Sequence, residues 1–186
     1  MTYFGFLLRF VGIPLLIMIA LTLRDMKRGK RMPEHLTGVP GWFALGAHIV
    51  MAVAWTTPRD NYLVATGVWY YDPNLVTGIT LGWVPIEEYT FFVVQTLLTG
   101  LWVLWLARNM KPAPPPVPSR PGLRIVAAAV VAALVVASVV VFFSGWKPGT
   151  YLALAVGWLM LPVIPQMLVG ADALWHNRRL VLLGLL

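Results

Sequence analysis

The chain has 186 residues, of which 59% are hydrophobic and only 11% are charged, and its formal net charge is +7. This composition, with a mean hydropathy of +0.78, is far from that of a soluble domain and predicts an integral membrane protein. Because the sequence contains no cysteine, disulfide bonds and thiolate metal sites are excluded.

Long apolar runs follow one another along the chain, each near the roughly 20 residues that a helix needs to cross a bilayer. Five runs are complete, at residues 2–23, 37–57, 89–107, 125–146 and 149–171. A sixth opens at Leu180. The first run lacks a basic leader and a cleavage site, so we expect a retained helix and not a signal peptide. Apolar residues do not alternate as they do in barrel strands. We therefore expect an all-α polytopic membrane bundle of five full transmembrane helices plus the start of a sixth.

Basic residues gather after the first, third and fifth runs. Eleven of the fourteen lie there: Arg24, Lys27, Arg28, Lys30, Arg31, Arg108, Lys111, Arg120, Arg124, Arg178 and Arg179. The connections at 58–80 and 145–149 carry only Arg59 and Lys147. The positive-inside rule then predicts a multi-pass protein of the cell membrane with its N-terminus outside. The positive charge reflects this topology and contact with anionic lipid, and no basic patch indicates a nucleic-acid partner.

A faint internal repeat relates the two ends of the chain. An offset of 148 residues relates Tyr3 to Tyr151, Pro14 to Pro162 and, approximately, Asp25 to Asp172. Two successive three-helix units would be inverted relative to each other, so the Ala/Val-rich run at 125–146 is expected to be a lipid-facing connector that restores the orientation. The predicted architecture is a seven-helix bundle of three, one and three helices.

This repeat divides the chain into three predicted parts. Residues 1–110 form the first repeat, and residues 111–148 hold a Pro-rich cytoplasmic linker with the connector helix. Residues 149–186 begin a second repeat that is apparently incomplete.

Four of the seven acidic residues cluster in the stretch 55–92, and we expect them at the outer ends of the second and third helices: Asp60, Asp72, Glu87 and Glu88. Pro85 and the two glutamates suit the first turn of a helix, where carboxylates accept unpaired amide hydrogens. That is one interpretation of the pair. The other is chemical, because ionisable groups at hydrocarbon depth are costly and usually functional, and adjacent carboxylates repel each other. One of the pair is then a candidate general acid.

Helical spacing places aromatic rings beside this acid. Phe91, Phe92 and Gln95 follow Glu88 on one face, whereas Glu87 is turned by about 100°. A carboxylic acid next to aromatic faces can protonate an apolar olefin and leave the carbocation over π-electrons. The two phenylalanines are equally suited to plain packing.

A second aromatic cluster precedes the motif. Trp69, Tyr70 and Tyr71 either line a substrate pocket or form an interfacial belt, and the pattern leaves both open.

The stretch "TPRDNYLVATGVWYYDP" followed by "PIEEYTFF" resembles the membrane-integral lycopene cyclase domain, which occurs as two small subunits, as one fused chain, or joined to phytoene synthase in fungi. The stretch "YLALAVGWLMLPVIPQMLVGADALWHNRRL" resembles the opening of that family's second repeat. The resemblance implies that Glu87 and Glu88 match the family's essential acidic pair. Asp60 matches the acid of its proline-aromatic-Asp pattern, although Arg59 replaces the aromatic residue.

The resemblance also implies a reaction. A protonated glutamate adds a proton to the linear ψ end group of lycopene or a related acyclic carotenoid, the ring closes, and a base removes a proton to give an ionone-type ring, which we expect to be β. Glu88 is the expected acid, with Glu87 or Asp60 as partner or base. The reaction has no net redox change, and no Gly-rich dinucleotide fingerprint is present, so we expect no cofactor.

The sequence lacks a second Glu-pair motif, which the repeat would place near positions 235 and 236. We therefore expect a second cyclase subunit or a C-terminal repeat to act with residues 1–186.

Other classes fit the residues less well. Isolated His35, His48 and His176 indicate no metal site, and Asp60 and Asp72 do not form the Asp-rich motif of a prenyltransferase. A retinal-binding photoreceptor needs a lysine inside a helix, but every lysine lies in a predicted loop. The remaining alternative is a non-enzymatic carotenoid-binding or proton-handling bundle.

Overall fold

The computed structural model describes residues 1–33, 38–110, 112 and 115–185, so His35 and Lys111 lie outside the described residues. The described chain is mostly helical, which confirms the expected all-α class. It divides into two compact units. The first comprises Met1–Ala65, Tyr70–Pro112 and Arg179–Leu186, and the second comprises Thr66–Trp69 and Ala113–Arg178.

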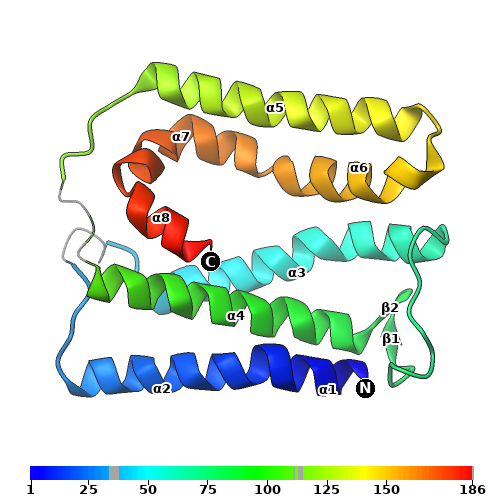
Figure 1. Ribbon diagram of the computed structural model, residues 1–186, viewed down its shortest axis with the longest axis horizontal. Helices are drawn as coiled ribbons and strands as arrows, with labels where there is room; N and C mark the ends of the chain where they lie inside the picture. The colour runs from blue at the N-terminus through cyan, green and yellow to red at the C-terminus, as the bar shows by residue number, and fades with distance from the viewer. Residues whose placement is uncertain (34–37, 111, 113–114, 186) are drawn as a thin grey trace. The chain divides into compact units, whose positions relative to one another are not determined.

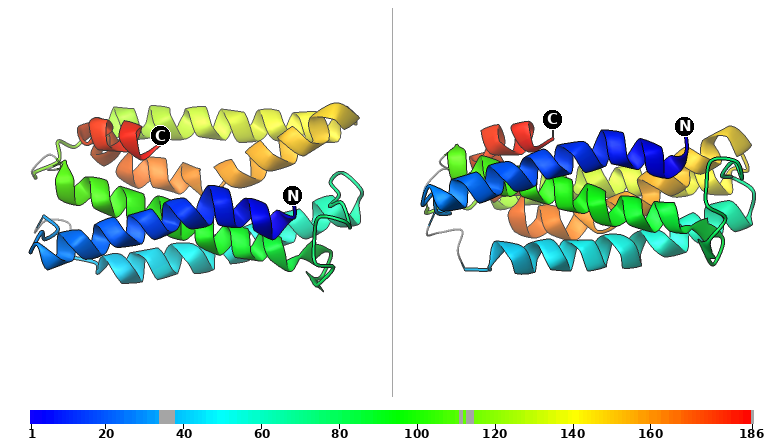
Figure 2. Two further views of the ribbon diagram at one scale, coloured as in Figure 1. Left: turned by 60° about the horizontal axis from the view of Figure 1, so that its bottom comes forward. Right: turned by 90° about the horizontal axis from the view of Figure 1, so that it is seen from below.

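The first unit contains three long helical segments and a short hairpin. Its elements are α1 (Tyr3–Leu7), the π-helix η1 (Leu8–Gly12), α2 (Ile13–Lys27), α3 (Gly41–Ala65), β1 (Thr80–Leu81), β2 (Val84–Pro85) and α4 (Ile86–Asn109), followed at the end of the chain by most of α8 (Arg178–Gly184). α4 packs against both α2 and α3 and is the central helix of this unit. Figure 1 and the right-hand view of Figure 2 show α4 lying between them.

The second unit contains α5 (Pro121–Phe143), α6 (Lys147–Met160) and α7 (Val163–His176). α5 packs along both α6 and α7, as Figure 1 shows. The predicted single run at 149–171 is broken: α6 and α7 meet at Leu161 and Pro162 with a bend of 54°. Proline has no backbone N–H and its ring clashes with the preceding turn, which accounts for the break.

Pro14 also follows a backbone irregularity. The N–H of Ile13 bonds the carbonyl of Leu8, five residues back, which closes the π-helical turn of η1. A wider turn of this kind absorbs one residue without interrupting the helix, so α1, η1 and α2 remain one continuous segment. Pro14 and Pro162 are related by the offset of 148 residues, but the repeat itself stays a prediction.

Among the described residues, three helices are long and apolar enough to cross a membrane: Tyr3–Lys27, Ile86–Asn109 and Pro121–Phe143. The bent pair of α6 and α7 is a fourth if it forms one span. These helices support a membrane protein. The expected count of five full spans stays a prediction, because α3 is 25 residues long but carries a polar segment near its C-terminal end.

That polar segment corrects one expectation. The sequence placed residues 58–65 in the second connection, whereas the structure continues α3 to Ala65, with Pro58, Arg59 and Asp60 inside the helix. The side chains of Thr57 and Asn61 hydrogen-bond carbonyls four residues back, at 2.6 Å and 3.0 Å. Both hydrogen bonds are local contacts within the helix.

In each unit, a buried aspartate also forms polar contacts between helices or their ends. In the first unit, Asp25 is fully buried and accepts a hydrogen bond from Asn109 Nδ2 at 3.0 Å, with Lys30 Nζ at 3.5 Å. In the second, Asp172 is 3% exposed and forms an ion pair with Arg124 Nη2 at 2.5 Å. Both aspartates therefore have a structural explanation within their own unit.

Candidate functional site

The two glutamates of the motif occupy the first turn of α4 and face different partners. Glu87 is 1% exposed, and its Oε1 accepts a hydrogen bond from the backbone N–H of Thr77 at 2.5 Å. Glu88 is half-buried, and its Oε2 accepts a hydrogen bond from the hydroxyl of Tyr3 at 2.5 Å. Successive residues of a helix point about 100° apart, which explains the separation.

Glu87 holds the connection between α3 and α4. Thr77 belongs to the loop before the hairpin, so the bond from its N–H to Glu87 fixes that loop against the start of α4. Val84, three residues before Glu87, is also fully buried. The other oxygen of Glu87, Oε2, is buried and has no hydrogen-bond partner. A carboxylate bound mainly by backbone and enclosed by protein is suited to holding structure.

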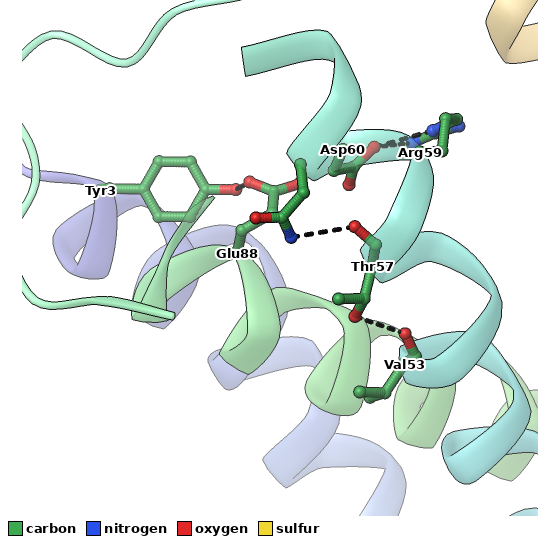
Figure 3. A network of polar contacts seen from close by, with 7 residues as sticks. Tyr3, Val53, Thr57, Arg59, Asp60 and Glu88 are labelled. Atoms are coloured by element: carbon green, nitrogen blue, oxygen red, sulfur yellow. Dashed lines mark hydrogen bonds and ion pairs between the residues drawn. The ribbon is translucent and has the colours of Figure 1, made fainter. Parts of the chain in front are cut away.

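Glu88 lies where α1, α3 and α4 meet (Figure 3). Tyr3 reaches it from the start of α1, and the Tyr71 side chain also hydrogen-bonds it. Asp60 and Arg59, both on α3, are close enough to act on its charge, with opposite signs. Glu88 is thus the acid on which the polar groups of this end of the unit converge.

Asp60 is buried, at 6% exposed, and is paired with its own neighbour in sequence. Arg59 places Nη2 at 2.5 Å and Nε at 2.7 Å from Asp60 Oδ1. A buried carboxylate needs such a partner, because an uncompensated charge in a low-dielectric environment is costly. Arg59, which departs from the family pattern, supplies this compensation.

Asn61 on α3 forms hydrogen bonds with the hairpin and with α4 next to the site. Asn61 Oδ1 accepts the N–H of Trp83 at 2.7 Å, and Asn61 Nδ2 lies 3.3 Å from the hydroxyl of Tyr89. Tyr89 in turn donates to the carbonyl of Leu81 at 3.0 Å. Gly82, at the hairpin turn, has φ of +68°, and a Cβ there would collide with the Asn61 side chain. The hairpin that starts α4 is therefore fixed to α3.

The predicted substrate-binding residues of α4 lie on the same helix as the acid. Phe92 is buried, whereas Phe91 and Gln95 are half-buried. The Phe91 and Phe92 rings are 6.3 Å apart at 59°, and Tyr89 meets Phe92 edge-on at 6.0 Å. An aromatic wall thus continues along α4 from Glu88.

The aromatic trio of Trp69, Tyr70 and Tyr71 is divided between the two units. Trp69 belongs to the second unit, where its ring stacks on Tyr151 at 5.3 Å. Tyr70 is 82% exposed. Asp72, also part of the predicted acid cluster, is exposed and accepts the N–H of Asn74 in a turn at 2.9 Å. Tyr71, which belongs to the first unit, contacts Glu88.

Sequence reasoning did not assign several residues that the structure places at the site: Tyr3, Thr77 and Asn61. The 148-residue offset singled out Tyr3, but no feature of the sequence connected Tyr3 to Glu88. Among the described residues, no group of three or more His, Asp or Glu side chains forms a metal site.

Comparison with known proteins gives a consistent family. Two lycopene beta-cyclases of Halobacterium salinarum, from strains R1 and NRC-1, are 36% identical over 135 residues, which cover 73% of this chain and 54% of each relative. A bifunctional lycopene cyclase/phytoene synthase of Sporisorium reilianum is 44% identical over 78 residues, 42% of this chain and 11% of the relative. The chain spans about half the length of the archaeal relatives. No family model and no solved structure matches significantly.

Proposed function

Because this chain belongs to the lycopene cyclase family, we propose that it forms part of a membrane enzyme that closes the end-group ring of lycopene or a related acyclic carotenoid. The observation that carries the proposal is the half-buried Glu88 carboxyl, held by Tyr3 at the start of a membrane helix whose next turn presents Phe91 and Phe92. A proton donor beside aromatic rings is what cyclisation through a carbocation requires.

Glu88 is the acid in this proposal. In its protonated form it adds H⁺ to the terminal double bond of the ψ end group, which leaves a tertiary carbocation. The neighbouring double bond attacks this cation and forms the carbon–carbon bond that closes a six-membered ring. A base then removes a proton from the ring, so one proton enters, one leaves, and the product is an isomer. Loss of the proton that gives the β ring is the outcome we propose.

Glu88 is favoured over Glu87 by its surroundings. Glu87 is enclosed by protein and bound by the backbone of Thr77, so an olefin has no route to it within this unit. Glu88 is half-buried and contacted by side-chain hydroxyls. A general acid has to come within hydrogen-bond reach of the atom that it protonates.

Asp60 is the second carboxylate of this cluster, and we propose it as the base or as the charge that balances the carbocation. Its electrostatic interaction with Glu88 supports this role. The Phe91 and Phe92 faces, with Gln95 one turn further, would border the ring as it closes. The reaction moves no net electrons, so no redox cofactor enters it.

We also propose that the active assembly needs a second acid cluster. The sequence offset relates Tyr151 and Pro162 to Tyr3 and Pro14, and the chain covers 54% of its archaeal relatives. A segment with a second proline-hydrophobic-Glu-Glu motif, in the same chain or in a partner subunit, would complete the seven-helix arrangement in the membrane.

The test is pigment analysis in cells that accumulate lycopene. The chain is expressed alone and together with a segment that carries the second motif. We expect ringed carotenoid only in the second case. A non-enzymatic carotenoid-binding protein would leave lycopene unchanged in both, and that result would contradict the proposed function. Robust cyclisation by the chain alone would instead contradict the need for a second cluster.

A further inference from the structure

Tyr3 and Glu88 are 85 residues apart in sequence, and their side chains make one of the shortest contacts of the site. The hydroxyl of Tyr3 donates to Glu88 Oε2 at 2.5 Å, from the first residue of α1 to the first turn of α4. Hydrogen bonds from a hydroxyl to a carboxylate are short and about twice as strong as those between neutral groups. This contact therefore limits where the Glu88 carboxyl can point.

The backbone of Tyr3 is fixed as well. Its N–H donates to the carbonyl of Leu75 at 2.8 Å, and Thr2 caps the same helix by accepting the N–H of Gly5 at 3.2 Å. Leu75 belongs to the loop that Glu87 holds through Thr77. Tyr3 is thus held at two points. Its backbone N–H bonds the loop, and its hydroxyl bonds Glu88 on α4.

We propose that Tyr3 is a positioning residue for Glu88, an inference that rests on the proposed function. The glutamate side chain has three rotatable bonds, and an acid that is misplaced by about 1 Å loses much of its rate. By holding Oε2, Tyr3 acts with Tyr71 to fix the direction in which the carboxyl presents its proton to the substrate. After the proton has been transferred, the same hydroxyl donates to the carboxylate that remains.

This assignment predicts two effects of Tyr3→Phe, which removes one oxygen and keeps the ring. The turnover number of the chain complemented with the second motif falls about 10-fold or more, equivalent to about 1.4 kcal/mol of transition-state stabilisation, while KM changes little. In addition, the environment of the Glu88 carboxyl changes even when no substrate is present. A purely structural role would lower the amount of folded protein and would not separate kcat from KM.

The second effect is measured without turnover. The chain holds only three glutamates, so ¹³C-labelled glutamate gives few carboxyl signals by solid-state NMR in lipid bilayers, and Glu88→Gln identifies the one from Glu88. Tyr62→Phe is the matched control, because it removes the same oxygen from a tyrosine that lies in α3 and is 46% exposed.

The expected result is a shifted Glu88 signal and a lower kcat in Tyr3→Phe, with neither in Tyr62→Phe. An unshifted Glu88 signal, or an unchanged kcat, would overturn the assignment of Tyr3. An inactive wild-type assembly that still shows the Tyr3-dependent signal would overturn the proposed function and leave the contact established, so the two failures are distinguishable.

Discussion

Glu87 and Glu88 are neighbours in sequence, yet the first meets the backbone of Thr77 and the second meets the hydroxyl of Tyr3. Glu87 thus contacts the loop before the hairpin, and the general-acid role is the one we propose for Glu88. A glutamine in place of Glu87 keeps an oxygen to accept the Thr77 N–H. A glutamine in place of Glu88 keeps the shape of the side chain but has no proton acidic enough to donate.

These two substitutions form a matched test. Glu88→Gln is expected to lower ring formation by about 100-fold or more, because general acid catalysis contributes about 10²–10⁴-fold. Glu87→Gln is expected to lower it less than about 10-fold, because the loop bond survives. Ring formation is measured by chromatography of extracted pigments, normalised to folded protein in the membrane. Comparable turnover by Glu88→Gln and wild type would show that another group donates the proton.

The sequence pattern is informative about some residues near Glu88 and uninformative about others, for a physical reason. Helical periodicity places Phe91, Phe92 and Gln95 relative to Glu88, because all four lie on one helix. It carries no information about Tyr3, which reaches the site from another helix through tertiary packing. The sequence left Trp69 open as part of a substrate pocket or of an interfacial belt, and in the structure its ring stacks on Tyr151.

At the scale of elements, two differences between the expected and the observed helices occur at prolines, Pro58 and Pro162. The second connection was predicted to begin at residue 58, whereas α3 continues through Pro58 to Ala65. The run at 149–171 was predicted as one helix, whereas the structure divides it at Pro162 into α6 and α7. The long apolar runs themselves predicted α2, α4 and α5 well, because length and hydropathy depend little on tertiary contacts.

The ion pair between Arg124 and Asp172 connects α5 to α7 and gives an element-scale prediction. Arg124→Met leaves Asp172 buried without its charged partner and should destabilise the second unit by about 1–3 kcal/mol, less than a fully buried pair because the guanidinium is partly exposed. Arg120→Met is the matched control, since Arg120 contributes only its backbone N–H to Asp172, at 3.4 Å.

Thermal unfolding in detergent measures both variants. We expect a lower Tm for Arg124→Met and a Tm close to wild type for Arg120→Met. Equal Tm values for the two variants would mean that the Arg124 side chain does not hold α5 against α7.

At the scale of the whole molecule, the distribution of basic residues predicts the orientation in the membrane. Residues 24–36 and 108–124 are expected in the cytoplasm and residues 58–80 outside. Arg28→Cys and Ile79→Cys introduce single thiols at exposed positions into a chain without cysteine. In intact cells, an impermeant thiol reagent should label the second and spare the first. Equal labelling, or the reverse pattern, would overturn the predicted orientation.

The three-helix, connector, three-helix arrangement stays a prediction at this scale. Tyr3 and Tyr151 share the offset of 148 residues, but Tyr3 bonds a carboxylate whereas Tyr151 stacks on Trp69. This difference is expected if the carboxylate that corresponds to Glu88 belongs to the second acid cluster that we propose. The sequence alone reveals the offset and not the partner.

Acid-catalysed, non-redox ring closure is the central claim, and cyclisation in D₂O tests it most directly. The complemented chain is supplied with lycopene in D₂O, and the product is analysed by mass spectrometry. The mechanism adds a solvent-derived proton to the end group and removes a different one, so each ring formed should carry one deuterium. Cyclic product without deuterium would contradict proton addition from an exchangeable acid such as Glu88.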